Sequence, residues 1–435
     1  MAPPEVALRP AAGHHVGVRR FAGLVLLCLV TTVHASGGDW PQFLGPSRDL
    51  VTSGENLAQK WPDAGPAVVW KRPVGQGFSG PVVADGKLIL FHRVGDDEVV
   101  ECLAADTGEG LWIARYPTAY RDDFGFDEGP RSTPTIDRGH VYTFGAEGKL
   151  QCRDFKSGRY VWSVDTRTTF KQDKGFFGIA CSPLVEGDAV VLNVGGRDGA
   201  GVVAFNRANG NVLWKATKDE AGYASPVAAT LGGHRYILSF NRAGLVALDP
   251  KDGAVRFTFP WRSRSHASVN AATPLVVGDS VFLSASYGTG AVLLKIAADA
   301  KPRAAWSGDE SLSNHYATSV HHGGFLYGFD GSQEERPRLR CVELETGKVR
   351  WSEEAFGAGT LLAAGDRLLI LKESGELVMA SASPEKFAPL GRAKILDAEC
   401  RAYPALANGL FYARDKGTLV CVDLLGGDGI PSRRR

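Results

Sequence analysis

Short apolar runs separated by glycine turns recur along nearly the whole chain. The stretch 132–162 shows the pattern, with apolar runs at 133–136, 141–144 and 150–155 and a fourth that opens at Tyr160. Arg138-Gly139 is the first of the three turns between them. Such runs, rich in Val, Tyr, Phe and Thr and bounded by X-Gly, are typical of antiparallel strands joined by tight turns. The unit therefore predicts one four-stranded sheet in every ~45 residues, which is the period of a propeller blade.

Three local signatures repeat with this unit. A glycine followed four residues later by an aromatic residue marks the turn before the fourth strand, at Gly108/Trp112, Gly158/Trp162, Gly210/Trp214, Gly253/Phe257 and Gly347/Trp351. The turn after the first strand occurs eight times, with its glycine at Gly86, Gly139, Gly187, Gly233, Gly278, Gly323, Gly365 and Gly409. Most first strands open with a small residue and proline, a position where proline removes no needed donor. Residues 66–425 thus predict an all-β fold, an eight-bladed β-propeller of four-stranded antiparallel blades.

The two ends of the predicted propeller complement each other. The last unit, 401–424, has three strands and lacks a fourth strand with its tryptophan. A strand without a unit of its own, 66–73, precedes the first blade and carries Trp70. We expect this N-terminal strand to complete the last blade, because that pairing closes the ring and removes its free edges.

The segments outside the repeats predict export. In residues 1–35, Arg19 and Arg20 precede an apolar run at 21–33, and Val33-His34-Ala35 fits a signal-peptide cleavage site. The run is too short to span a bilayer. We therefore expect cleavage, a periplasmic or otherwise exported location and no stable membrane anchor; Sec and twin-arginine export both stay open.

Two further segments flank the propeller. Residues 36–65 carry Trp40 and Phe43 and predict an extended segment packed by its aromatic side chains on the outside of the propeller. Residues 426–435 are polar and basic and predict a disordered tail.

Charge and cysteine usage narrow the class of partner. The net charge is +1, and removal of residues 1–35 takes away Arg9, Arg19, Arg20 and Glu5, which leaves −1. A net charge of this size produces no electrostatic field that would attract nucleic acid or an anionic membrane. We also expect a monomer.

The cysteines follow the repeat. Cys102, Cys152, Cys341 and Cys421 each lie six residues before a turn glycine, in a slot that holds alanine in other units. They predict small buried core positions with free thiols. Cys181 and Cys400 lie elsewhere, and a bridge between them stays open.

The repeated order of Ser-Pro, Asp-Gly, Leu, Asp, Thr-Gly and Trp resembles the PQQ-like, or quinoprotein-type, β-propeller repeat, over nearly all of residues 66–424. That family includes PQQ-dependent dehydrogenases and also the BamB-type assembly protein, which binds partner proteins and no cofactor. The segment from Trp40 to Gly45 resembles that of other exported members. The resemblance implies that the aromatic residues ending the fourth strands lie between neighbouring blades, namely Trp70, Trp112, Trp162, Trp214, Phe257, Trp306 and Trp351.

The same resemblance implies a ligand face at the links between each fourth strand and the next first strand. The long links are 115–131, 165–181, 260–272 and 307–317. Residues next to the first strands should converge on a central funnel, and these are Phe78, Arg131, Phe177, Tyr223, Asn270, His315 and Arg401. Cationic and aromatic side chains suit an anionic or planar ligand, including a peptide with a carboxylate. In the alternative interpretation they fill the funnel, with Glu128 and Glu399 as internal partners of the two arginines.

Two hypotheses of different classes remain. The first is an exported non-catalytic scaffold that binds a protein or ligand, BamB-like in architecture and without a cofactor. The second is a PQQ-dependent oxidoreductase with PQQ and calcium in the funnel. The acidic cluster at Asp122, Asp123, Asp127 and Glu128 predicts either a calcium loop or a solvated loop. No adjacent cysteine pair, haem-attachment motif, nucleophile elbow or zinc signature is present, and this favours the scaffold.

Overall fold

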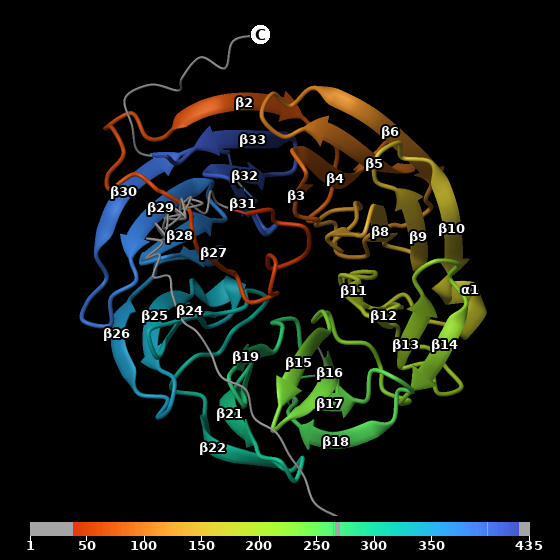
Figure 1. Ribbon diagram of the computed structural model, residues 1–435. Coiled ribbons are helices and arrows are strands. Elements are labelled where there is room, and N and C mark those ends of the chain that lie inside the picture. Colours follow the sequence, from red (N-terminus) through yellow and green to blue (C-terminus); the bar gives the residue numbers. More distant parts are fainter. Residues whose placement is uncertain (1–37, 264, 266–269, 398, 426–435) are drawn as a thin grey trace, which may run out of the picture. The chain divides into compact units, whose positions relative to one another are not determined.

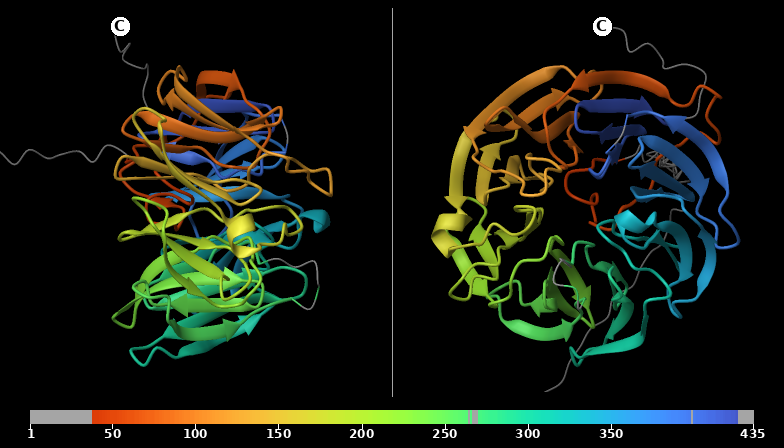
Figure 2. Two further views of the ribbon diagram at one scale, coloured as in Figure 1. Left: turned by 90° about the vertical axis from the view of Figure 1, so that its right-hand side faces the viewer. Right: turned by 180° about the vertical axis from the view of Figure 1, so that it is seen from behind.

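The chain folds into a ring of eight sheets around a central axis. The computed structural model describes residues 38–263, 265, 270–397 and 399–425, all within one compact unit. Each sheet is one blade, and the blades follow one another around the ring (Figure 1; Figure 2). The predicted eight-bladed, all-β propeller is confirmed. The predicted signal peptide at 1–35 and the predicted tail at 426–435 lie outside the described residues.

Blades 1–4 follow the chain in order, each with its first strand nearest the axis. Blade 1 is β3 (Val82–Ala84), β4 (Lys87–Val94), β5 (Asp97–Ala104) and β6 (Gly110–Pro117). Blade 2 is β7 (Thr135–Asp137), β8 (His140–Phe144), β9 (Lys149–Asp154) and β10 (Tyr160–Asp165), followed by the short helix α1 (Thr166–Phe170). Blade 3 is β11 (Leu184–Glu186), β12 (Ala189–Asn193), β13 (Val202–Asn206) and β14 (Val212–Ala216). Blade 4 is β15 (Val227–Leu231), β16 (His234–Asn241), β17 (Gly244–Leu248) and β18 (Val255–Pro260).

Blades 5–8 complete the ring. Blade 5 is β19 (Leu275–Val277), β20 (Ser280–Ala285), β21 (Gly290–Ile296) and β22 (Pro302–Gly308). Blade 6 is β23 (Val320–His322), β24 (Phe325–Asp330), β25 (Arg338–Glu343) and β26 (Val349–Glu353), with the 3-10 turn η1 (Gln333–Glu335) between β24 and β25. Blade 7 is β27 (Gly359–Ala364), β28 (Arg367–Lys372), β29 (Glu376–Ser381) and β30 (Pro389–Lys394), to which β1 (Val51–Thr52) adds in parallel. Blade 8 is β31 (Ala405–Ala407), β32 (Leu410–Arg414), β33 (Thr418–Asp423) and the N-terminal β2 (Ala67–Pro73).

Closure of the ring follows the prediction. Strand β2 pairs antiparallel with β33, with Trp70 opposite Cys421. The last blade thus takes its outer strand from the N-terminal part of the chain. This pairing covers the edge of β33, which would otherwise be free.

The tryptophan and glycine signatures are two halves of one contact between blades. The Trp162 indole donates to the Arg207 carbonyl of the next blade at 3.0 Å, and a Cβ added to Gly210 would lie 2.7 Å from the Trp162 ring. The same relation joins Trp70 to Gly108 and Trp214 to Gly253. The turn needs glycine because the ring of the preceding blade lies where a side chain would be, so the predicted interblade position of the tryptophans is confirmed.

A belt of hydrogen bonds explains the small residue before each first-strand proline. The Thr133 amide donates to the Ser182 hydroxyl at 2.9 Å, and the Ser182 amide donates to the Ser225 hydroxyl at 2.8 Å. The belt continues from blade to blade, from Gly80 to Thr133, from Ser225 to Thr273, from Thr273 to Thr318 and from Thr318 to the Tyr403 hydroxyl. Each short hydroxyl side chain thus satisfies a buried amide on its neighbour and fixes the blades in register around the axis.

The N-terminal segment lies inside the ring, which corrects the prediction that it packs on the outside. Residues 38–52, hereafter the axial segment, contact the innermost strands of several blades and lie at the centre of the ring in Figure 1. Trp40 bridges to Val83 of blade 1, and the Phe43 ring meets Tyr403 of blade 8 at 5.1 Å. Trp40, Leu44 and Leu50 are buried. A wide ring leaves an axial gap between its first strands, and these apolar side chains fill it.

Arg48 ties the tip of the axial segment to blade 3. Its guanidinium donates to the carbonyls of Pro183 at 2.8 Å and Ser182 at 3.2 Å. Burial lowers the Arg48 pKa to about 10. Only the following stretch, with Trp61 against Gly391 of β30, lies on the outer side of the ring as predicted.

The core carries the cysteines as predicted. The four third-strand cysteines are buried, free and packed among the strands. Cys181 and Cys400 are also buried and free, so the open question of a bridge between them is answered: they are not paired. No helix within the described ranges is long and apolar enough to cross a membrane.

Candidate functional site

The links before the first strands form one end of the axis, hereafter the mouth. Two arginines from different blades meet there on one aromatic ring. The guanidinium carbons of Arg131 and Arg401 each lie 5.5 Å from the centroid of the Phe78 ring. Arg131 precedes blade 2 and Arg401 precedes blade 8, so the ring closure brings together residues far apart in the sequence. Cation–π contacts of this kind favour the charged guanidinium on the electron-rich ring face.

Phe177 and Tyr223 join the same cluster. Arg131 lies 6.0 Å from the Phe177 ring, and the Phe177 and Tyr223 rings are 5.9 Å apart. The Phe177 amide donates to the Tyr223 hydroxyl at 2.8 Å. Burial raises the pKa of Tyr223, so the hydroxyl stays neutral. Five of the seven predicted residues are therefore in one connected group, namely Phe78, Arg131, Phe177, Tyr223 and Arg401.

The link 115–131 adds an apolar surface to this group. The Phe124 and Phe126 side chains are 53% and 42% exposed. Phe124 lies 5.1 Å from Phe177 and 6.3 Å from Phe176, and Phe126 also contacts the Arg401 guanidinium at 5.3 Å. Phe124, Phe126, Phe176 and Phe177 together are hereafter the aromatic patch.

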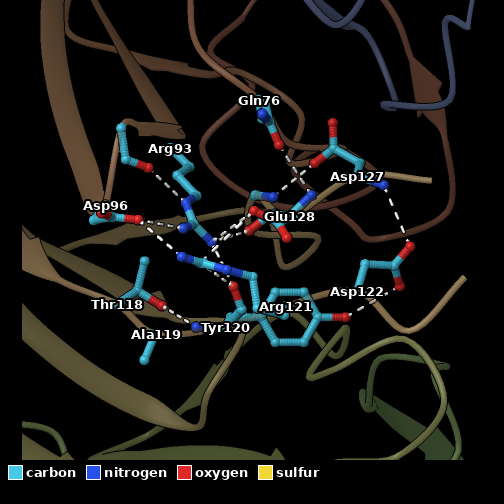
Figure 3. Close-up of polar contacts among 12 residues, drawn as sticks. Gln76, Arg93, Asp96, Thr118, Ala119, Tyr120, Arg121, Asp122, Asp127 and Glu128 are labelled. Atoms are coloured by element: carbon cyan, nitrogen blue, oxygen red, sulfur yellow. Dashed lines mark hydrogen bonds and ion pairs between the residues drawn. The ribbon is translucent and has the colours of Figure 1, made fainter. Parts of the chain in front are cut away.

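Arg93 holds this link in place through several polar contacts (Figure 3). Its buried guanidinium donates to the Tyr120 carbonyl at 2.6 Å and to the Glu128 carbonyl at 3.2 Å, at two points of the link. It also pairs with the Asp96 carboxylate at 3.0 Å. A buried arginine with carbonyl and carboxylate partners is a rigid anchor, because releasing it would leave its charge unpaired.

Asp122 braces the tip of the link. Its carboxylate accepts from the Phe126 amide at 2.6 Å, and its other oxygen lies 3.6 Å from Arg131. The aromatic patch is therefore presented by a preorganised loop whose charges are satisfied internally.

The partners of the two mouth arginines differ from those expected. Arg131 pairs with Asp122 and Arg401 with Glu373, at 3.6 Å and 3.2 Å. The expected partners pair elsewhere: Glu128 lies near Arg93 and Arg121, and Glu399 lies near Lys416. Closeness in sequence failed here: Arg131 meets a carboxylate from an earlier part of its own link, and Arg401 meets one from the turn between β28 and β29 of blade 7.

His315 and Asn270 take other places at the mouth. The His315 ring lies 3.0 Å from the Tyr287 hydroxyl, and burial lowers the His315 pKa, so the ring stays neutral. It contacts the neighbouring Tyr316, whose hydroxyl donates to Glu373 at 2.6 Å.

Asn270 is buried and structural. Its amide donates to the carbonyls of Asn241 and Trp261, and its own carbonyl accepts from the amides of Tyr223 and Ala224. It positions Tyr223 rather than facing a ligand.

The acidic cluster of the link is partly buried and partly solvated: Asp122 and Asp127 are buried, whereas the Asp123 side chain is 62% exposed. Asp122 is fully buried and pairs with Arg131, and Asp123 accepts from Lys174 at 2.6 Å. Glu128 lies within 3.7 Å of two arginines. In the part of the chain that the structure describes, no three His, Cys, Asp or Glu side chains are placed to hold a metal.

Sequence reasoning missed several members of this site. Phe124, Phe126 and Tyr120 lie in the long link that the sequence singled out, and their aromatic character was a usable signal. Glu373 and Arg93 gave no such signal in the sequence, because each reaches the mouth from a strand or turn whose sequence is ordinary for a blade.

A family model described as outer membrane protein assembly factor BamB matches residues 95–353, more than half of the chain. The quinohemoprotein alcohol dehydrogenase ADH-IIG of Pseudomonas putida is 30% identical over 142 residues, which are 31% of this chain and 18% of that protein. The chain thus matches less than a fifth of the length of that curated relative.

Solved structures share the fold. BamB from Moraxella catarrhalis superposes with a TM-score of 0.61 at 17% identity, over 84% of this chain and 99% of that one. The quinohemoprotein alcohol dehydrogenase of Comamonas testosteroni superposes with a TM-score of 0.63 at 16% identity, over 92% and 83%. At these identities the likeness concerns the fold alone.

Proposed function

Since the chain belongs to the family of the outer membrane protein assembly factor BamB, we propose that it is an exported, non-catalytic propeller that binds a partner protein at its mouth. The observation that carries this proposal is the aromatic patch. Two exposed phenylalanines stand on a loop that Arg93 and Asp122 hold rigid, beside two arginines. Aromatic and arginine side chains on a preformed surface are the usual centres of protein interfaces, and rigidity lowers the entropic cost of binding.

The mouth does not fit the alternative, a quinone with calcium. Pyrroloquinoline quinone is a flat polycarboxylate that needs an open slot, and its calcium needs free oxygen ligands. Here two guanidinium groups cover the Phe78 ring. Asp122 and Glu373 already pair with Arg131 and Arg401, and in the described part of the chain Asp127 offers one buried oxygen without a partner, too few for a calcium ion. No step of a redox reaction is therefore assigned to these residues.

The test compares two pairs of exposed apolar residues. The double variant Phe124→Ala, Phe126→Ala removes the patch. The control, Leu111→Ala, Ile113→Ala, removes side chains of similar exposure (48% and 51%) from the outer strand β6. Partners retained from a periplasmic extract are identified by mass spectrometry, purified and titrated against the parent and both variants.

We expect the patch variant to weaken binding of the purified partner by at least tenfold, equivalent to ~1.4 kcal/mol, while the control binds like the parent. A partner that loses affinity with the control and not with the patch variant would move the interface to the outer strands. A parent that retains no partner in any extract would contradict the proposal.

A further inference from the structure

A cavity of about 190 Å³ lies beside the aromatic patch, between the links 115–131 and 165–181. Its wall is formed by Ala119, Tyr120, Arg121, Ala146, Glu147, Arg167, Gln172, Asp173, Lys174 and Ile179. At ~30 Å³ for each water molecule, this volume suits a handful of waters or one small organic group. None of the seven residues predicted from the sequence lines it.

Gln172 leaves one buried polar atom without a partner in this wall. The side chain is 6% exposed, and its oxygen accepts from the Thr166 hydroxyl at 2.6 Å. Its amide nitrogen has no hydrogen-bond partner among the described residues. A buried donor without an acceptor costs free energy, so the site is incomplete until something with an acceptor oxygen enters the cavity.

The charges around the cavity favour an anionic acceptor. Lys174 has three N–H donors, and its ion pair with Asp123 at 2.6 Å uses one of them. Glu147 is neutralised from inside the protein, because it accepts from Thr118 and Ala119 and lies 3.5 Å from Arg167. Arg121 is similarly occupied by Asp96 and Glu128. Gln172 and Lys174 therefore keep donors for a ligand, and Arg167 keeps several beyond the nitrogen that faces Glu147. The three cations of the wall, Arg121, Arg167 and Lys174, outnumber its two carboxylates, Glu147 and Asp173.

The cavity and the aromatic patch adjoin each other. Lys174 lines the cavity, lies 5.4 Å from the Tyr120 ring and pairs with Asp123, the residue before Phe124. Phe176 and Phe177 follow Lys174 by two and three residues and face Phe124. A polar hollow with free donors thus borders an exposed apolar surface.

From this juxtaposition we propose that the mouth recognises a carboxylate joined to an apolar group, with the carboxylate in the cavity on Gln172 and Lys174 and the apolar group on the aromatic patch. Such a ligand is either the free C-terminus of a peptide with an apolar last residue or a small apolar carboxylic acid. The inference rests on the proposed function, since it names the chemistry by which the same surface would select its partner.

The experiment titrates the full mature chain with a fluorescent pentapeptide, Gly-Ser-Gly-Ser-Phe, with a free C-terminal carboxylate. Three other ligands separate the contributions: the same peptide as its C-terminal amide, the peptide ending in serine, and free 3-phenylpropionate as a competitor. The protein variants are Gln172→Met and Lys174→Met. Lys156→Met, an exposed lysine in the turn after β9, is the matched control for the loss of one positive charge. Thermal unfolding of every variant is recorded in parallel.

We expect the free-carboxylate peptide to bind at least tenfold more tightly than the amide and than the peptide ending in serine. Gln172→Met and Lys174→Met should each weaken it by about tenfold, and Lys156→Met should leave it unchanged. Competition by 3-phenylpropionate at concentrations near those of the peptide would identify a small acid as the source of the carboxylate; weak competition would identify a peptide terminus. Equal binding of amide and carboxylate, or an unchanged affinity in Lys174→Met, would overturn the inference even if Gln172→Met fails to fold.

The two proposals fail separately. If a purified partner still depends on Phe124 and Phe126 but binds Lys174→Met and Gln172→Met like the parent, the protein interface stands and the carboxylate site falls. If the peptide behaves as expected and no protein partner depends on the patch, the site binds carboxylates and the scaffold role falls.

Discussion

Both ends of the propeller axis are lined by residues next to the innermost strands, but different kinds of side chain occupy them. One end and the channel behind it are filled by the axial segment, whose Trp40, Leu44 and Leu50 are buried and whose Arg48 donates to two carbonyls. The mouth instead keeps the exposed side chains of Phe124 and Phe126. The protein thus closes its own channel, and the proposed function places binding at the rim of the mouth.

The arginines sharpen this contrast. Arg48 donates to backbone carbonyls in the belt of hydrogen bonds around the axis and so links the axial segment to blade 3. Arg131 is 11% exposed in its side chain and has one guanidinium nitrogen without a partner among the described residues. Arg48 also keeps one buried nitrogen without a partner there, so the contrast lies in their contacts: Arg48 donates to backbone carbonyls, whereas Arg131 lies against the Phe78 and Phe177 rings at the mouth.

The largest expected effect comes from opening the filled end. Deletion of residues 38–52 removes three large buried apolar side chains, each worth ~2–5 kcal/mol, so we expect a loss of ~6–15 kcal/mol in the free energy of unfolding. Urea unfolding measures it. The variant Phe124→Ala, Phe126→Ala, at the open end, should unfold like the parent; similar losses from both would remove the difference between the two ends.

The next effect concerns a support beneath the mouth that responds to pH. His92 accepts from the Gly75 amide at 2.8 Å, at the start of the link that carries Phe78. Burial, with the charges of Arg414, Arg115 and Arg72, lowers its pKa to about 3. The folded protein therefore binds fewer protons than the unfolded chain, so this stabilisation is present above pH ~6.5 and is lost as the pH falls toward 3.

Between pH 7.5 and 4.5 we expect the parent to lose ~2 kcal/mol more than His92→Gln, whose side-chain oxygen also accepts from Gly75 and does not titrate. Urea unfolding at both pH values provides the four free energies. Equal pH dependence of parent and variant would mean that His92 already carries its proton in the folded state.

A matched pair of arginine variants tests the contrast directly. Arg48→Met removes the side-chain donor of the Ser182 carbonyl and one of the two donors of the Pro183 carbonyl, which also accepts from Thr135. It should cost ~1–3 kcal/mol of stability, with partner binding unchanged. Arg131→Met should cost less, because Asp122 keeps its bond from the Phe126 amide, but it should weaken binding at the mouth. Chemical denaturation and titration of the purified partner are run on both; an exchange of the two phenotypes would contradict the assignment of the ends.

The smallest effect is a change in thiol reactivity. Burial raises the pKa of Cys152, Cys181 and Cys421 to about 12 and of Cys102 to about 11, so native protein should react slowly with iodoacetamide at pH 8. Cys181 precedes Ser182, which Arg48 contacts. In Arg48→Met, Cys181 should therefore be the first to react, as mass spectrometry of alkylated peptides would record. Prior labelling of Cys152 would place the loosened region in blade 2 rather than at the filled end.

The amino-acid sequence determined the repeat and therefore the fold. Turn glycines, interblade tryptophans and small residues before proline are local requirements repeated in every blade, so one chain displays them many times. It also determined closure, because Trp70 stood alone before the first blade and the last blade lacked its partner. Four cysteine slots could be recognised as core positions for the same reason.

The tertiary structure alone decided what fills the axis and which charges meet at the mouth. The axial segment has no repeat to place it, and its aromatic residues suit the outside of the ring as well as the channel. Arg131 pairs with Asp122 because their common link folds back on itself, and Arg401 pairs with Glu373 from the turn between β28 and β29 of blade 7. The cavity at Gln172 exists only where two such links lie side by side. Contacts between non-repeating segments depend on the path that each link takes in space. The local sequence pattern does not encode that path.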